Sequence, residues 1–377
     1  MATIEAYATK SGKRYRVRYR KPDRKPTDKR GFKTKREAEA FAATVEVSKL
    51  KGEFIDATAS RATIGTLGPA WLGRQSHLKP SALRPVESAW RIHVEPHWGK
   101  IPVAEIRKTG VQQWVSNLSN GDKSATPPRS PKGATTVIRA YGVLASILDE
   151  AVDDRRILSN PSRGVNLPRK TKKPHVYLSH EQVHTLAETS KYPLLVLVLA
   201  YCGLRWGEVT GLRVRDVNMI RRRLQLEQNA VDVGGKIMVG TLKSHKSRAV
   251  PFPKFLEQAM GEACKDKHRD DLVFPGPSGS YMGIAASGEE RGSWFASAVT
   301  SSGIPRVTPH DLRHTAASFA VSAGANVKAV QRMLGHSSAA MTLDIYAELF
   351  DDDLDAVAVA LDKAVTESIV GKKWAKQ

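Results

Sequence analysis

Cysteine is nearly absent from this sequence, since only Cys202 and Cys264 occur among 377 residues. Two cysteines cannot supply the disulfide framework of a small secreted fold, and no CxxC pair is present to hold a zinc ion. Long apolar runs are missing too. The longest, residues 194–202, is far shorter than the ~20 residues of a membrane-spanning helix, and the first residues lack the apolar core of a secretory signal. We therefore expect a soluble, cytosolic protein without a disulfide scaffold.

Motifs for nucleotide and zinc chemistry are also missing. No segment matches the phosphate-cradling loop GxxxxGK followed by Ser or Thr, which argues against nucleotide hydrolysis as a source of energy. The 11 histidines occur neither in HExxH nor in the HxE and PCxxC spacing of zinc deaminases. We therefore expect no cofactor and no metal ion.

Acidic residues are outnumbered, with 38 Asp and Glu against 59 Lys and Arg, so the formal net charge is +21. Such a charge favours a polyanionic partner, because each Lys or Arg placed on a phosphate releases a condensed counterion. An anionic membrane surface is the other candidate. The surplus is uneven: residues 1–56 carry +8, residues 57–173 carry +11 and residues 174–377 only +2. Nucleic-acid binding is therefore expected mainly in the first half of the chain.

The most basic segment has the pattern of a strand. Tyr15, Val17 and Tyr19 alternate strictly with Arg14, Arg16, Arg18 and Arg20. A period of two places these apolar and basic side chains on opposite faces. Residues 10–36 contain 14 basic and 2 acidic residues. The pattern predicts an arginine-lined face that enters a DNA groove, and the alternative is a solvated strand face beside a floppy basic loop.

Around this strand we expect a small domain of three strands and one helix, covering residues 1–56. Ser11 and Gly12 indicate a turn, and Gly31 with Phe32 suggests a further short strand after a loop at 21–30. Thr34 and Glu37 have capping-box spacing and predict a helix. Its inward residues are predicted to be Ala38, Phe41, Val45 and Leu50.

Three further segments follow. Residues 63–167 show helical periodicity and predict an all-α domain, and residues 168–174, PRKTKKP, form a basic linker. Residues 175–349 predict a mixed, mostly helical α+β domain with a buried helix at 194–202 and strands at 224–230, 236–241 and 248–252. Residues 350–377 form a C-terminal tail, where Leu354, Val357, Ala360 and Leu361 suggest an amphipathic helix. The fold class is therefore multidomain.

The third domain contains residue types suited to binding and attacking a phosphate. These are Arg205, His310 and Arg313 at i and i+3, His336 and Tyr346. Singly, each has a bland explanation: a surface charge, a helix cap or a packed aromatic side chain. In this order and context the set resembles the tyrosine recombinase family of phage-type integrases. The resemblance implies that Tyr346 is a nucleophile that forms a 3′-phosphotyrosyl link, without metal or ATP.

The resemblance also assigns roles to the other residues. Two guanidiniums, of Arg205 and Arg313, would hold the non-bridging oxygens and stay charged at cellular pH. The family needs a lysine on a hairpin as general acid, and Lys243 matches best, with Lys246 as the alternative. His310 is a candidate to help Tyr346 lose its proton and His336 to donate to the phosphate. Glu208, one turn after Arg205, is expected to orient that arginine rather than to react.

By resemblance, residues 1–56 would bind arm-type DNA sites, and residues 63–167 core-type sites, with Lys170, Lys172 and Lys173 of the linker along the backbone. The active form would be a homotetramer on double-stranded DNA in the cytoplasm or nucleoid of a host cell. Its C-terminal tails would be exchanged between protomers, and the alternative is that each tail packs on its own domain. A host DNA-bending protein and a directionality factor would assist. The alternatives are a Xer-like or transposon recombinase, a DNA-binding regulator without catalysis, and a relaxing topoisomerase.

Overall fold

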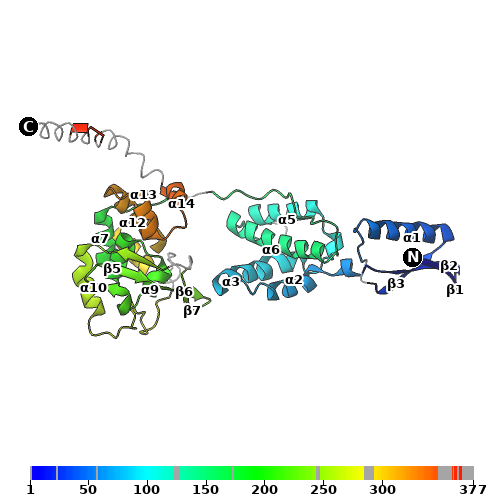
Figure 1. Cartoon of the computed structure of the whole chain (residues 1–377), viewed down its shortest axis with the longest axis horizontal. Coiled ribbons are helices and arrows are strands. Elements are labelled where there is room, and N and C mark those ends of the chain that lie inside the picture. The colour runs from blue at the N-terminus through cyan, green and yellow to red at the C-terminus, as the bar shows by residue number, and fades with distance from the viewer. Residues whose placement is uncertain are drawn as a thin grey trace, which may run out of the picture. The chain divides into compact units, whose positions relative to one another are not determined.

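The structure is a computed structural model, and it describes residues 2–22, 24–56, 58–122, 128–171, 174–242, 247–283 and 293–346, with 359, 361–362 and 365–366 of the tail. The chain divides into two compact units, Met1–Lys172 and Lys173–Gln377, and Figure 1 labels helices and strands of both. Within the described ranges, no helix has both the length and the apolar character needed to cross a membrane.

The first unit begins with an antiparallel sheet in the order β1-β2-β3, formed by β1 (Thr3–Thr9), β2 (Gly12–Arg20) and β3 (Pro26–Phe32). Helix α1 (Lys35–Leu50) follows, and its first turn is capped by the side chain of Thr34, which accepts from the Glu37 amide. Three strands and one helix were predicted here, and this is confirmed. The loop predicted at 21–30 is wrong in its second half, because β3 begins at Pro26 and pairs with β2 as far as Arg20.

One face of this sheet packs on α1. Val17 is fully buried, and the ring of Phe41 lies 5.9 Å from Tyr19 and 5.3 Å from Phe32. The inward position predicted for Leu50 is wrong, because this side chain is 87% exposed. A residue five positions after Val45 is rotated by about 140° around a helix, which turns it away from the sheet.

The remainder of the first unit is helical, as expected for residues 63–167. Its α-helices are α2 (Ile64–Gly73), α3 (Pro80–Ala89), α4 (Glu95–Trp98), α5 (Lys108–Asn120) and α6 (Ala134–Asp153). A π-turn at Trp90–Val94 joins α3 to α4. Trp90, Val111, Leu144 and Leu148 lie in its continuous apolar core. The bundle therefore has a core of its own, formed by side chains at helical spacing.

Over its described residues, the second unit is mostly helical and contains two small sheets. Its helices are α7 (His180–Thr189), α8 (Pro193–Cys202), α9 (Trp206–Thr210), α10 (Glu257–Cys264), α11 (Trp294–Ser302), α12 (Pro309–Ser322), α13 (Val327–Leu334) and α14 (Ala339–Tyr346). One sheet has the order β4-β5-β8, from β4 (Val217–Asn218), β5 (Arg223–Leu226) and β8 (Arg248–Pro251); β6 (Gln228–Val233) pairs with β7 (Lys236–Thr241) in the other.

Two elements of this unit test the sequence predictions directly. The buried helix predicted at 194–202 is confirmed as α8, which packs between α7 and α12. The single strand predicted at 224–230 is wrong, because Glu227 separates β5 from β6 and the two strands belong to different sheets. The apolar residues Leu224, Leu226 and Ala230 are all buried, so their even spacing concealed the break.

Helix α8 ends at Gly203, whose φ of +65° is in the left-handed region that favours glycine. A Cβ at this position would lie 2.8 Å from a side-chain atom of Leu334. The C-terminal end of α8 therefore lies directly against the end of α13, and the next helix, α9, begins shortly after Gly203.

The tail predicted at 350–377 lies largely outside the described residues, and so do Leu354, Val357 and Ala360 of its predicted apolar stripe. The described residues 359, 361–362 and 365–366 are helical and exposed. The tail's role in assembly stays a prediction.

Candidate active site

Arg205 is the N-cap residue of α9, immediately after the end of α8. Its Nη1 donates to Glu208 Oε1 at 2.9 Å, its backbone N–H donates to Glu208 Oε2 at 2.9 Å, and its Nη2 donates to the Gly335 carbonyl at 3.4 Å. The side chain is 28% exposed. Arg205 is therefore held at two points while part of its guanidinium still faces outward.

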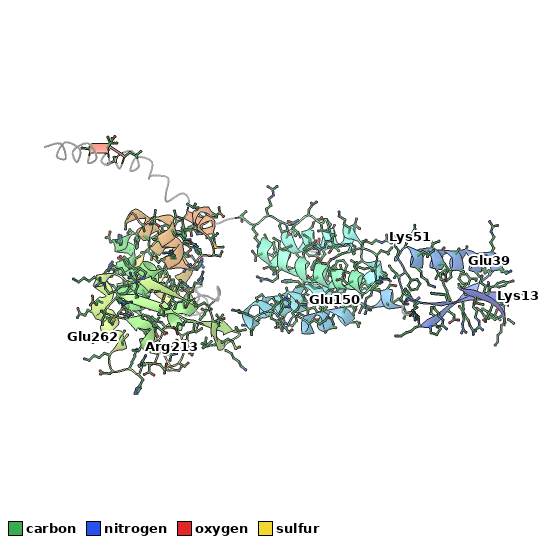
Figure 2. All side chains as sticks on the ribbon, viewed as in Figure 1. Lys13, Glu39, Lys51, Glu150, Arg213 and Glu262 are labelled. Atoms are coloured by element: carbon green, nitrogen blue, oxygen red, sulfur yellow. The ribbon has the colours of Figure 1, made fainter. Side chains whose placement is uncertain are left out.

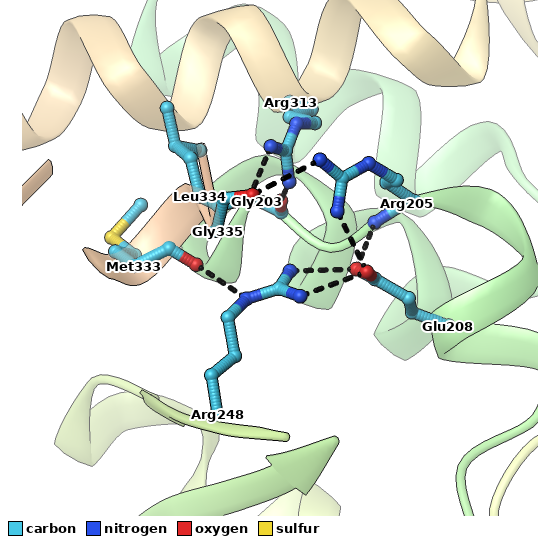
Figure 3. A network of polar contacts seen from close by, with 8 residues as sticks. All are labelled: Gly203, Arg205, Glu208, Arg248, Arg313, Met333, Leu334 and Gly335. Carbon is cyan, nitrogen blue, oxygen red and sulfur yellow. Dashed lines mark hydrogen bonds and ion pairs between the residues drawn. The ribbon is translucent and has the colours of Figure 1, made fainter. Parts of the chain in front are cut away.

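Glu208 also binds a second arginine that the sequence analysis did not assign. Arg248, the first residue of β8, donates to both oxygens of the carboxylate at 2.9 and 2.7 Å, and its Nε donates to the Met333 carbonyl at 3.1 Å. Burial favours a raised pKa for Glu208, but the hydrogen bonds and charge of Arg248 outweigh it, and the pKa is lowered. The buried carboxylate therefore joins α9 to β8, and Arg248 extends this network to the end of α13 (Figure 3).

Arg313 lies on α12 and is 2% exposed. Its Nη1 donates to the Gly203 carbonyl and its Nη2 to the Leu334 carbonyl, so the guanidinium joins the ends of α8 and α13 (Figure 3). Burial, and then the charge of Arg205, lower the pKa of Arg313 to about 9. The side chain therefore remains charged at neutral pH.

The two predicted histidines have different surroundings. His310 is exposed on the first turn of α12, which Thr308 and Asp311 cap reciprocally. His336 is half-buried just after Gly335, with its Nδ1 3.0 Å from Thr342 Oγ1. Burial, followed by the charge of Arg313, lowers the pKa of His336 to about 4. A neutral His336 is therefore expected at physiological pH.

Tyr346 is the last residue of α14 and is fully buried. Its ring is nearly parallel to that of His336, with centroids 6.2 Å apart, and its hydroxyl lies 2.8 Å from His314 Nδ1. Burial raises the pKa of Tyr346 to about 12, although the charge of Arg313 works in the opposite direction. The phenol is therefore protonated at neutral pH, and it lies among the histidines His175, His314 and His336.

The sequence analysis missed three residues of this cluster. His314 follows Arg313 and contacts the phenol, whereas His310, the residue expected to help Tyr346, contacts the His314 ring at 4.9 Å. His175, at the start of the unit, lies 4.0 Å from the same ring. Arg248 is the third. The i, i+4 spacing of His310 and His314 was a signal for the first, since such residues share a helix face.

The lysines Lys243 and Lys246 lie outside the described residues, as do Lys172 and Lys173. Lys170 is described and exposed. No group of three or more potential metal ligands among His, Cys, Asp and Glu occurs in the described part of the chain.

The predicted arginine face of the first unit lies on β2. Arg16 and Arg18 both pair with Glu5 of β1, at 2.6 and 3.1 Å, while Arg18 and Arg20 are exposed. Lys13, which is labelled in Figure 2, is the second residue of the same strand. Exposed pairs of this kind contribute little to stability, about 0–1 kcal/mol, so these guanidiniums remain available to a polyanion.

Comparison with known proteins gives matches in both units. Residues 176–352 match the phage integrase family, and residues 6–49 match an arm DNA-binding domain. The integrase of Mycobacterium phage L5 is 27% identical over 284 residues, which is 73% of this chain and 72% of the relative. The tyrosine recombinase XerC of Haemophilus influenzae is 30% identical over 217 residues, 55% of this chain and 68% of the relative.

Solved structures share the fold. The Tn1549 transposon integrase, in complex with a circular intermediate DNA, has a TM-score of 0.65 and 21% identity, covering 79% of this chain and 99% of its own. A lambda integrase tetramer bound to a Holliday junction has a TM-score of 0.57 and 16% identity, covering 88% of this chain and 95% of its own.

Proposed function

Because the chain belongs to the phage integrase family of tyrosine recombinases, which cut and rejoin DNA at specific sites, we propose that Tyr346 is the nucleophile of its strand transfer. The observation that carries this proposal is the position of the phenol. It lies beside His336 and Arg313, in the same unit as both phosphate-binding arginines. One protomer therefore supplies both the proposed nucleophile and the arginines proposed to bind the phosphate.

Arg205 and Arg313 are proposed to hold the scissile phosphate. Negative charge grows on the non-bridging oxygens during in-line attack, and groups fixed in advance stabilise it without reorganisation. Arg313 is fixed by two backbone carbonyls and Arg205 by Glu208. The half-buried His336 is proposed as a neutral donor to the same phosphate.

The reaction forms a bond between the Tyr346 oxygen and phosphorus and breaks the bond from phosphorus to the 5′ oxygen of the next nucleotide. The leaving oxygen needs a proton, and Lys243 is proposed to supply it, with Lys246 as the alternative. The phosphotyrosine keeps the phosphodiester bond energy, so the 5′-hydroxyl of another strand reverses the step. Exchange of the first pair of strands produces a Holliday junction, and the same reaction on the second pair of strands resolves it.

The domain assignments are also proposals. Residues 1–56 would bind arm-type sites through the arginines of β2, and residues 63–167 would bind core-type sites together with the catalytic residues 175–349. The charges of +8 on residues 1–56 and +11 on residues 57–173, a range that includes most of the basic linker, support this division. The linker at 168–174, with Lys170, Lys172 and Lys173, would follow the DNA backbone between core-binding and catalytic domains.

At the level of the assembly, we propose a homotetramer on DNA with C-terminal tails exchanged between protomers. The lambda integrase tetramer on a Holliday junction supports this stoichiometry by similarity of fold. A host DNA-bending protein would bring arm and core sites together, and a directionality factor would choose between integration and excision. Integration of a phage genome is the favoured role, and a Xer-like or transposon recombinase is the alternative.

The test uses a nicked DNA duplex that carries the core site. The core site is mapped beforehand from recombination junctions, and the nick prevents the cut strand from being rejoined. The wild type should accumulate a covalent 3′-phosphotyrosyl complex. Tyr346→Phe should bind the duplex without forming it. A covalent complex with Tyr346→Phe would disprove the nucleophile, and a wild type that binds without cutting would favour a regulator without catalysis.

A further inference from the structure

The hydroxyl of Tyr346 is enclosed by protein, and among the described residues its hydrogen-bond partner is His314 Nδ1, at 2.8 Å. A buried hydroxyl without a partner costs about 1–3 kcal/mol, so this bond is the main restraint on the phenol oxygen. A protonated phenol that has one acceptor in reach donates to it. The Nδ1 atom of His314 therefore accepts a hydrogen bond from the Tyr346 hydroxyl, and the imidazole of His314 carries its own hydrogen on Nε2.

His314 also fixes the phenol relative to the phosphate-binding site. It follows Arg313 directly on α12, and that guanidinium is tied to the carbonyls of Gly203 and Leu334. The phenol oxygen is thus hydrogen-bonded to the residue that follows a fixed arginine in the chain. This arrangement gives the nucleophile a defined position before DNA binds.

The surroundings of His314 keep it neutral. The His175 and His310 rings lie 4.0 and 4.9 Å from its own, and Arg313 adds a positive charge. The acidic group nearby, Asp311, receives the backbone N–H and hydroxyl of Thr308, each at 2.7 Å. Burial first, then His175 and His310, lower the pKa of His314 to about 4. An unprotonated Nδ1 lone pair is therefore always present at neutral pH.

Building on the proposed nucleophile, we propose that His314 is a catalytic residue that accepts the phenol proton of Tyr346 as the bond from oxygen to phosphorus forms. Because the O–H points at His314, this hydrogen bond does not use the lone pairs of the oxygen, and phosphorus can reach them once the buried phenol becomes accessible to DNA. The acidity of the phenol rises steeply as that bond forms, so a weak base is sufficient for a concerted transfer. The negative phosphodiester also offsets the repulsion that disfavours the imidazolium.

The proton balance closes over one cycle. His314 gains the phenol proton, and the 5′ oxygen leaves with the electron pair of its bond to phosphorus and takes a proton from the general acid. In the rejoining step a 5′-hydroxyl attacks the phosphotyrosine and returns its proton to the general acid. The tyrosine oxygen then leaves and recovers its proton from His314. No oxidant, metal or nucleotide takes part.

The experiment uses His314→Asn and His314→Gln in the full chain, because both amides form hydrogen bonds but neither accepts a proton at neutral pH. Covalent complex formation on the nicked duplex is timed with the protein saturating. Each variant should bind the duplex as the wild type does and cut it about 10²-fold more slowly or worse. Two substitutions are used so that a folding defect in one leaves the other informative.

The chain contains a matched control. His180 Nδ1 lies 2.7 Å from Tyr201 Oη, which reproduces the same pair of atoms on α7 and α8, outside the proposed site. His180→Asn should cut at the wild-type rate. If His314→Asn or His314→Gln also cuts at that rate, His314 is not the proton acceptor.

A second substrate tests whether His314 acts on the nucleophile or on the leaving group. Sulfur in place of the bridging 5′ oxygen leaves as a thiolate and needs no general acid. It should restore cutting by a variant that lacks the general-acid lysine, and should leave the His314→Asn defect unchanged. Restoration of His314→Asn by sulfur would place His314 at the leaving group and overturn the proposal. Cutting by Tyr346→Phe would instead remove the proposed nucleophile itself.

Discussion

The two units use arginine in opposite ways. On β2 of the first unit, Arg16 and Arg18 share the partly exposed Glu5, and Arg18 is 54% exposed. In the second unit, Arg313 is 2% exposed and donates to two backbone carbonyls, and Arg248 binds a carboxylate that is 1% exposed. The arginines of β2 provide positive charge, whereas the arginines of the second unit provide hydrogen-bond donors in fixed positions.

The difference shows which physical property each region needs. Binding along a DNA backbone depends on the number of cations near phosphates and is screened by salt. Stabilising a transition state depends on donors that do not move. An arginine of β2 should therefore be replaceable by another cation, whereas an arginine of the catalytic unit should not.

The largest effect is expected for Arg313→Lys. A lysine keeps the charge but cannot contact the carbonyls of Gly203 and Leu334 and a phosphate oxygen together, because its three donors share one nitrogen. Covalent complex formation should fall by about 10³-fold, or about 4 kcal/mol of transition-state stabilisation. Timed cutting of the nicked duplex measures this. A loss of less than about tenfold would show that charge alone suffices here.

Next in size is Arg248→Met, which removes the bidentate partner of the buried Glu208. Breaking a buried pair from one side typically costs about 3–5 kcal/mol, and urea denaturation of the purified protein should detect it. Cutting should slow as well, because Arg205 loses its oriented carboxylate. Arg215→Met breaks the exposed pair of Arg215 with Asp270 and serves as the control, with little expected change. Equal stability of the two variants would contradict the structural role of Arg248.

A smaller effect is expected from pH. His314 and His336 have pKa values of about 4 in the folded chain against about 6.5 in the unfolded chain. The unfolded chain therefore binds more protons between these values, and the free energy of unfolding should decrease as pH falls from about 6.5 toward 4. His336→Asn should reduce this decrease, and the exposed His268→Asn should not. Denaturation curves at pH 7 and pH 5 provide the measurement.

The smallest effect is expected on the sheet. Arg18→Ala should lower arm-site affinity and reduce the slope of log affinity against log salt by about 0.9, the value for one phosphate contact. Arg18→Lys should recover most of both, in contrast to Arg313→Lys. Lys35→Ala, on the exposed side of α1, is the control. If Arg18→Lys fails as Arg18→Ala does, Arg18 makes a geometric contact and the contrast between the units weakens.

Local patterns in the sequence were sufficient for much of the fold. The alternation on β2, the capping residue Thr34 and the apolar run of α8 all predicted elements that the structure contains. Each of these signals depends on residues that are close together in the sequence. The break at Glu227 and the exposure of Leu50 escaped because spacing alone does not show which neighbour a side chain meets.

The candidate site was predictable as a set of residue types and not as a network. Arg248 meets Glu208 across 40 residues, Tyr346 meets His314 across 32, and Arg313 meets the Gly203 carbonyl across 110. Such contacts depend on how α9, α12 and α14 pack, which periodicity does not encode. The family resemblance named the reacting groups. The sequence signal for His314 was its i, i+4 spacing from His310, whereas Arg248 and His175 became visible only in the folded chain.

The two carbonyls that receive Arg313 have an electrostatic consequence. Gly203 and Leu334 lie at the C-terminal ends of α8 and α13, where aligned peptide dipoles place roughly half a negative charge per helix. Two such ends together nearly balance one guanidinium. The site therefore presents a weaker field to a distant phosphate than its arginines suggest, and strong attraction begins only when an oxygen reaches the remaining N–H groups. If the proposed roles hold, long-range capture of DNA falls to the basic first half of the chain, and the active site discriminates by contact.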